Sequence, residues 1–224
     1  TLSAAIEIAN EIAPEHLELC VDNPFDYLDS IRHAGSIWSL VCQYRMTGDG
    51  ALIPKIEKSI EYMLDDYVLY DGSDIAYLYE KDDDEIKLGG CGVAVIALTE
   101  YMDAFNSTKY EDIAVKLGNG ILTMLNSYTG EYYHVLNGNF TRKAEYRTVY
   151  YDGEATFGLC RLYSLAGDEK WLDAAKSAVE HFIKADYTQF KDHWVAYSMN
   201  EITQFVQDER YYDFALRNAN ESLK

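Results

Sequence analysis

The sequence is organised as a helical hairpin that recurs four times. Each copy has an apolar helix, a short polar turn and a second, amphipathic helix, and the copies fall at about 36–64, 91–125, 154–183 and 194–223. In the third copy, apolar residues at three-and-four spacing form one helix face: Trp171, Leu172, Ala175, Ala178, Val179, Phe182 and Ile183. A lone hairpin cannot bury its apolar face, so the copies must pack side by side.

The turns inside the hairpins support this interpretation. The segments TGDG, NSTK, AGDE and QDER each place Gly, Asn or Asp where one helix ends and the next needs an N-cap. Eight helices are fewer than the twelve of a complete ring of six hairpins. The sequence therefore predicts an all-α protein, an array of antiparallel helical hairpins that forms a partial or open α/α toroid over residues 36–224, with residues 1–35 as an N-terminal segment docked on it.

Two connections between hairpins are long and rich in aromatic residues. They cover residues 67–90 and 128–153, and each contains a turn signal, YDGSD in the first and LNGN in the second. We expect each to form a short β-ribbon insertion. Both run from the second helix of one hairpin to the first helix of the next, so they should lie at the same end of the array and form its functional face.

Residues that could carry chemistry lie where the first helix of each hairpin begins. The segments RHAG, LGGCG, YDGEA and DHWVA all occupy this position and should converge on one rim. Acid and base groups there are catalytic candidates, and the remaining cations and aromatic side chains are candidates for substrate binding. The catalytic set is Asp152, Glu154, His193, Asp192 and His33, and the substrate-binding set is Arg32, Arg147, Tyr150, Tyr151 and Trp194.

A purely structural interpretation exists for the same carboxylates. Asp152 could be the N-cap of a helix and Glu154 an acidic residue in its first turn, where the helix dipole favours negative charge. The acidic segments 71–74 and 82–85 lack the spacing of a calcium loop, and His134 and His181 lack partners at metal-ligand spacing. We therefore expect no metal and no cofactor.

Composition limits the partners. Lys and Arg number 19 against 38 Asp and Glu, which gives a formal charge of −19 and argues against nucleic acid and anionic membranes. Twenty tyrosines suit a sugar-like ligand or simple packing. Four scattered cysteines, no signal peptide and no eighteen-residue apolar run predict a cytoplasmic protein with reduced thiols. Because the chain begins at Thr1, other parts of a longer chain are a further expected partner.

Three motifs connect residues 36–223 with a known fold. They are LAGDEKWLDAA (165–175), YYDGEA (150–155) and DHWVAYSMNEI (192–202). In these the chain resembles the six-hairpin glycosidase-like superfamily, which includes sugar epimerases, unsaturated glucuronyl hydrolases and mannanases. The resemblance implies an α/α toroid that acts on carbohydrate, and it specifies the fold more than the reaction.

Residues 5–37 carry a second and sharper resemblance. IAPEHLEL, followed by NP, YL and HAGSI, is similar to histidinol dehydrogenase, a zinc enzyme that oxidises histidinol in two NAD-dependent steps. The resemblance implies an acid/base role for Glu15 and His16. It stops at Ile37, and the zinc ligands and nucleotide-binding domains of that family have no counterpart here. An amphipathic, structural role for Glu15 and His16 is therefore favoured.

The two resemblances meet near Ile37. Their join could have arisen by gene fusion, by a crossover or as a chimeric chain, and the sequence leaves these three origins open. It also leaves three functions open. The first is a carbohydrate-processing or carbohydrate-binding domain of hydrolase or epimerase type, with acid/base residues on the rim. The second is a non-catalytic interaction scaffold that uses its tyrosine-rich rim. The third is a histidinol dehydrogenase fragment, expected to be inactive without zinc and NAD sites.

Overall fold

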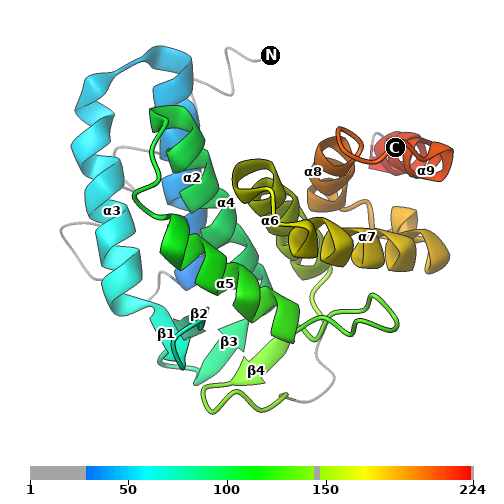
Figure 1. Cartoon of the computed structure of the whole chain (residues 1–224), viewed down its shortest axis with the longest axis horizontal. Helices are drawn as coiled ribbons and strands as arrows, with labels where there is room; N and C mark the ends of the chain where they lie inside the picture. Colours follow the sequence, from blue (N-terminus) through cyan, green and yellow to red (C-terminus); the bar gives the residue numbers. More distant parts are fainter. Residues whose placement is uncertain (1–28, 144–146, 223–224) are drawn as a thin grey trace.

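The computed structural model describes residues 29–143 and 147–222. Four helical hairpins follow one another along the chain, as the repeat predicts (Figure 1). The first helices of the hairpins, here called the inner helices, are α2 (Ser30–Thr47), α4 (Leu88–Phe105), α6 (Tyr151–Ala166) and α8 (His193–Ile202). The second, outer helices are α3 (Ile53–Asp66), α5 (Glu111–Thr123), α7 (Glu169–Lys184) and α9 (Glu209–Ser222). Short 3-10 turns, η1 (Gly50–Leu52) and η2 (Tyr187–Phe190), precede α3 and α8.

The helix ends follow the turn residues of the sequence. Gly48, Asn106 and Gly167 adopt the left-handed conformation directly after α2, α4 and α6. This conformation satisfies the last carbonyls of a helix and suits Gly and Asn. The all-α hairpin array predicted from the sequence is confirmed.

The first hairpin begins earlier than predicted. Asp29 is the N-cap of α2, and its carboxylate accepts a hydrogen bond of 2.8 Å from the backbone N–H of Arg32. Because α2 starts at Ser30, the predicted boundary at residue 35 falls inside a helix. The sequence analysis missed this because Ser30 and His33, on the buried face of the first turn, are polar.

The two long connections form one sheet instead of two separate ribbons. Strands β1 (Val68–Asp71), β2 (Ile75–Glu80) and β3 (Glu85–Lys87) come from the first connection, and β4 (Val135–Asn137) comes from the second. The four strands are antiparallel in the order β1-β2-β3-β4. Ile86 pairs with Leu136, so the sheet ties the two connections together below α3 and α5 (Figure 1).

Helix α4 is the buried centre of the array. It packs against α2, α5 and α6, and its buried residues run from Leu88 to Met102. By length and composition α4 could cross a membrane, which corrects the expectation that the chain lacks an eighteen-residue apolar segment. Because 78% of that segment is buried within the protein, its apolar character is explained by its place in the core.

Glycines allow α4 and α6 to approach closely. A Cβ atom added to Gly92 would lie 2.6 Å from the carbonyl carbon of Glu154 and 2.7 Å from the nitrogen of Ala155. On the facing helix, a Cβ on Gly158 would lie 3.0 Å from the oxygen of Gly92. The two backbones therefore meet with no space for a side chain between them.

We expect Gly92→Ala to lower the free energy of unfolding by about 1–3 kcal/mol, because the added methyl group must push two backbones apart. Gly35→Ala is the matched control, since a Cβ there has only Val93 Cγ1 at 4.0 Å. That substitution should leave stability unchanged or raise it by up to about 1 kcal/mol, as expected for Gly to Ala in a helix. Urea unfolding followed by circular dichroism measures both, and equal effects would contradict the close packing of α4 on α6.

Candidate functional site

Three carboxyl groups gather where α6 and α8 begin. Asp152 and Glu154 lie in the first turn of α6, and Asp192 directly precedes α8. Their exposed fractions are 2%, 6% and 0%, respectively. The sequence predicted these residues to share a rim, and the structure brings them together as a buried cluster that we call the carboxyl cluster.

Asp152 is held by two basic side chains. Nε2 of His134 lies 2.9 Å from its Oδ2, and the guanidinium of Arg147 lies 3.1 Å from the same oxygen. The backbone N–H of Thr148 donates to Nδ1 of His134 at 2.8 Å, so a neutral ring carries its proton on Nε2, facing Asp152. The interpretation of Asp152 as an N-cap is wrong, because Tyr150 occupies that position without a side-chain cap bond.

Arg147 makes several contacts with the protein, although its side chain is 41% exposed. Besides Asp152, its guanidinium donates to Oε1 of Glu131 at 2.9 Å and to the hydroxyl of Tyr187 at 2.8 Å. These contacts connect the loop before α6 to η2 before α8. The geometry favours a role for Arg147 in positioning Asp152, where the sequence had predicted a substrate ligand.

Glu154 is buried without such support. Its side chain extends over Gly89 at the start of α4, and within the described part of the chain Oε2 has no hydrogen-bond partner. Burial, with a smaller contribution from the charge of Asp192, raises the pKa of Glu154 to about 8. Glu154 is therefore protonated at neutral pH and is able to donate a proton.

Asp192 combines a structural and an electrostatic role. It is the N-cap of α8, and its Oδ1 accepts a 2.8 Å hydrogen bond from the backbone N–H of Trp194. Burial is the main cause that raises the pKa of Asp192 to about 7. The backbone hydrogen bonds lower this pKa, and the charge of Asp152 raises it further. Because Asp192 is fully enclosed, it can influence Glu154 but cannot contact a substrate directly.

The remaining candidates near the cluster are more accessible. His193, the first residue of α8, is exposed, and its ring centroid lies 5.6 Å from that of Tyr150. Partial desolvation lowers the pKa of His193, so its ring is neutral and able to accept a proton at neutral pH. Tyr151 is half-buried beside His134 at 5.6 Å, and Trp194 is half-buried one residue after His193.

Two predicted rim residues lie apart from the cluster. His33 is buried against α3, where its Nε2 lies 2.9 Å from the carbonyl oxygen of Ser59 and desolvation lowers its pKa. The Arg32 side chain is 69% exposed and pairs with Asp29 at 3.5 Å. The sequence placed both on the rim by analogy with the other hairpins, but the His33 side chain lies against the outer helix α3.

An aromatic surface was missed by the sequence analysis except for Trp194. Trp38 from α2, Phe157 from α6 and Trp194 and Tyr197 from α8 form a continuous set of ring contacts, which we call the aromatic patch. The contact between Trp38 and Trp194, 5.4 Å between centroids, shows that α2 and α8 face each other although they are not consecutive in the array. The sequence did contain one indication of this surface, because Phe157 follows the rim candidate Glu154 by three residues in the same helix.

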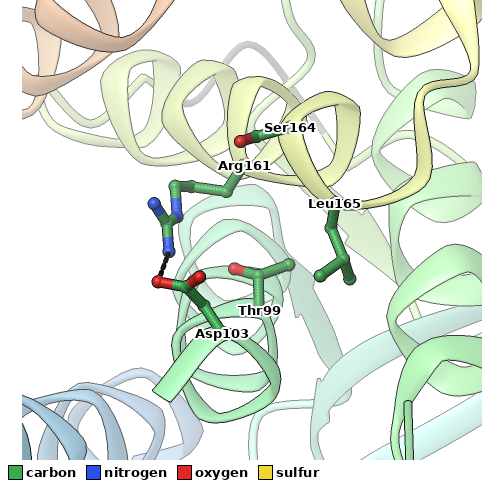
Figure 2. Close-up of a pocket in the computed structure, with 5 residues that line it drawn as sticks. All are labelled: Thr99, Asp103, Arg161, Ser164 and Leu165. Carbon is green, nitrogen blue, oxygen red and sulfur yellow. Dashed lines mark ion pairs between the residues drawn. The ribbon is translucent and has the colours of Figure 1, made fainter. Parts of the chain in front are cut away.

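Ion pairs join the opposite ends of the inner helices. Arg45 of α2 contacts Glu100 and Asp103 of α4 at 2.6 and 2.7 Å, and Arg161 of α6 contacts Glu100 at 3.2 Å and Glu201 of α8 at 3.5 Å. Beside Arg161 lies a cavity of about 50 Å³ whose lining is shown in Figure 2: Thr99, Asp103, Arg161, Ser164 and Leu165. That volume holds a few water molecules and is too small for a sugar ring.

The described residues hold no group of metal-ligating side chains. Across 29–143 and 147–222, no three His, Cys, Asp or Glu side chains are grouped as metal ligands would be. Cys42, Cys91 and Cys160 are free thiols, and burial raises the pKa of Cys42 to about 11.

The helical hairpins and their small sheet form an α/α toroid-like fold. The chain is similar to a glycoside hydrolase family 76 mannosidase from Bacteroides thetaiotaomicron VPI-5482, with 16% identity, a TM-score of 0.64 and coverage of 80% of this chain and 55% of that one. It is also similar to a cellobiose 2-epimerase from Bacillus thermoamylovorans B4167, with 16% identity, a TM-score of 0.71 and coverage of 86% and 60%. It is similar, too, to the α-1,6-mannanase of Salegentibacter sp. HEL1_6, with 15% identity, a TM-score of 0.74 and coverage of 92% of this chain and 68% of that one. At these identities the likeness establishes the fold.

A different relationship covers the N-terminal end. The profile of the histidinol dehydrogenase family matches residues 1–49. The histidinol dehydrogenase of Clostridium acetobutylicum is 58% identical over 38 residues, and that of Nitrosomonas europaea is 65% identical over 37 residues. The chain spans 9% of the length of these relatives. Glu15 and His16, the acid/base pair that this resemblance implies, lie outside the described residues.

The raised pKa of Glu154 makes the free energy of unfolding depend on pH. In the unfolded chain this carboxyl titrates near 4.5, and in the folded protein near 8. Between these values the folded protein holds a proton that the unfolded chain has released, so stability falls as the pH rises. We expect the free energy of unfolding of the wild type, compared with that of Glu154→Gln, to fall by up to about 1.4 kcal/mol for each pH unit between these two values.

Urea unfolding at several pH values between 5 and 8 measures this difference. Glu209→Gln removes an exposed carboxylate from the first turn of α9 and serves as the matched control. Its stability profile should run parallel to that of the wild type. A parallel profile for Glu154→Gln as well would show that Glu154 ionises normally in the folded protein.

Proposed function

We propose that this chain is the hairpin domain of a carbohydrate-processing enzyme of hydrolase or epimerase type. The observation that carries the proposal is the burial of the Glu154 carboxyl without a hydrogen-bond partner among the described residues, which raises its pKa to about 8, beside a helix start that presents the exposed His193. Proton donors and acceptors with pKa values displaced toward neutrality are typical of acid/base catalysis. The similar solved structures include mannosidases and sugar epimerases, which supports carbohydrate as the substrate.

In this proposal Glu154 is the general acid. Cleavage of a glycosidic bond requires a proton on the leaving oxygen, and epimerisation requires proton transfer at a ring carbon; a protonated carboxyl serves either reaction. His193 is the general base, since its neutral ring can accept a proton from water or from the sugar. Asp192 is a positioning residue, because its charge favours the protonated form of Glu154.

Arg147 and His134 support the site without contacting substrate. The guanidinium of Arg147 pairs with the carboxyl group of Asp152 and Nε2 of His134 faces it at 2.9 Å, which fixes Asp152 between the loop before α6 and η2. Without these partners a buried charge would be left uncompensated, which costs several kcal/mol. One related structure is described as an inactive variant of an α-1,6-mannanase, with two adjacent aspartates replaced, in complex with α-1,6-mannotetrose. Its loss of activity on replacement of carboxylates supports carboxyl chemistry in this fold.

The test is an activity assay with two readouts. Release of reducing ends from α-1,6-mannan oligosaccharides measures hydrolysis, and chromatography of cellobiose and mannose measures epimerisation or isomerisation. We expect Glu154→Gln to lower kcat by about 10²- to 10⁴-fold with little change in KM, because it removes a proton donor and keeps the shape of the side chain.

The control variant Glu209→Gln should retain full activity. Equal rates for the wild type and Glu154→Gln would remove Glu154 from the mechanism. A folded protein that binds these sugars without converting any of them would instead favour the non-catalytic scaffold, which needs only the exposed aromatic surface of the rim.

A further inference from the structure

Two glycines of α4 face α6 and meet different parts of Glu154. Gly89 and Gly92 are three residues apart, so they lie on one face of the helix. A Cβ atom on Gly92 would lie 2.6 Å from the carbonyl carbon of Glu154, whereas a Cβ atom on Gly89 would overlap its carboxyl oxygen Oε2. Gly92 therefore determines how closely the helices approach, and Gly89 determines where the carboxyl group lies.

The space over Gly89 is filled by side chains alone. A Cβ atom there would also lie 2.8 Å from Cε1 of the Tyr151 ring, and the three atoms nearest to it all belong to the side chains of Glu154 and Tyr151. A side chain can rotate away from an added methyl group, whereas a backbone moves only together with its helix. We therefore expect Gly89→Ala to move the Glu154 carboxyl and to leave the packing of α4 on α6 in place.

The position of the carboxyl group is set by this fit. Oε2 of Glu154 is buried and has no hydrogen-bond partner among the residues that the structure describes. The charge of Asp192, at the start of α8, further disfavours an ionised Glu154. The basic side chains of the adjoining segments are engaged by other carboxyl groups, Lys87 by Asp83 and Glu85, and Arg147 and His134 by Asp152.

Burial in this space has a chemical consequence. It is the main cause that raises the pKa of Glu154 to about 8, because the ionised form would lose its hydration. A methyl group on residue 89 would push the carboxyl group out of the space, and a displaced carboxyl group can regain water. Its pKa should then fall toward the ordinary value of 4.5.

We propose that Gly89 is a positioning residue for Glu154, because the absence of its Cβ atom creates the space in which the Glu154 carboxyl is held beside the ring of Tyr151. The placement of the carboxyl group stands on the geometry of α4 and α6. Its effect on catalysis rests on the proposed function, in which Glu154 is the general acid.

Urea unfolding between pH 5 and 8 tests the placement without any need for turnover. In the wild type the free energy of unfolding should fall across this range, because the folded protein keeps a proton on Glu154 that the unfolded chain has released. In Gly89→Ala the difference between pH 5 and pH 8 should shrink to less than about half of the wild-type difference. In the Glu154→Gln background the same substitution should leave the pH dependence unchanged, because the titrating group is gone.

Gly90→Ala is the matched control, because it adds a methyl group to the same turn of α4. Its Cβ atom would face α2 and β2, with Ile31 Cγ1 at 3.2 Å and Leu78 Cδ2 at 3.4 Å. Whatever its effect on stability, this variant should keep the pH dependence of the wild type. An equal change in Gly90→Ala, or an unchanged pH dependence in Gly89→Ala, overturns the proposal.

The pH profile of kcat gives a second readout, on whichever of the sugars named above the wild type converts. A general acid must be protonated, so a lower pKa moves the alkaline limb of the profile to lower pH. We expect Gly89→Ala to lower kcat at pH 7 by about tenfold and to recover toward the wild-type value at pH 5. A loss that is equal at both pH values would reflect a general disturbance of the site and would contradict the proposal.

A further variant covers the case in which Gly89→Ala does not fold. Gly89→Ala combined with Glu154→Ala removes the overlapping carboxyl group and should fold. Failure of this double variant would place the overlap at Tyr151 and overturn the proposal.

The outcomes separate this inference from the proposed function. A changed pH dependence of unfolding in Gly89→Ala, without conversion of any sugar by the wild type, supports the placement and removes the catalytic proposal. Turnover that depends on Glu154, with Gly89→Ala behaving as the wild type does in both readouts, supports the function and overturns the role of Gly89.

Discussion

The close contact between the backbones of α4 and α6 is the constraint on which the site depends. Gly92 and Gly158 remove the side chains that would hold the two helices apart. The Glu154 side chain lies over Gly89, between the start of α4 and α6, and its Oε2 is buried without a hydrogen-bond partner among the described residues. Burial then disfavours the ionised form of the carboxyl group. A packing requirement of the fold thus produces the chemical property that the proposed reaction uses.

The same arrangement orders the inner helices into three levels. The carboxyl cluster lies at their N-terminal ends, the aromatic patch follows about one helical turn further along, and the ion pairs of Arg45 and Arg161 join their C-terminal ends. Each cation at the last level bridges different helices, so these pairs hold α2, α4, α6 and α8 together. The carboxyl cluster is buried, whereas His193 and Tyr197 near it are exposed.

Much of the fold could be predicted from the sequence, because the hairpin repeat is a local pattern. Apolar spacing in residues 171–183 and turn residues such as Gly167 and Asp168 determine helices regardless of distant contacts. The shared sheet could not be predicted in this way, because the pairing of Ile86 with Leu136 depends on two connections meeting in space. For the same reason the sequence predicted two separate ribbons.

The site was predictable in part. Asp152, Glu154 and Asp192 were grouped by their equivalent positions in the repeat, and that equivalence holds for α6 and α8. It fails for His33, whose Nε2 lies 2.9 Å from the carbonyl oxygen of Ser59 in α3. His134 was dismissed as an isolated histidine, because its partner Asp152 follows eighteen residues later and is brought to it by the fold. Residues 30–37 also fit both the dehydrogenase-like segment and α2, which is how the two patterns can share one stretch of chain.

The most direct test of this account is the protonation state of Glu154 itself. Carboxyl carbon NMR of protein labelled at glutamate, compared with Glu154→Gln to assign the signal, follows the titration of this group. The account predicts a neutral carboxyl at pH 7 that ionises near pH 8. A midpoint near the ordinary value of 4.5 would contradict it, because Glu154 would then be charged, solvated and unable to serve as a proton donor.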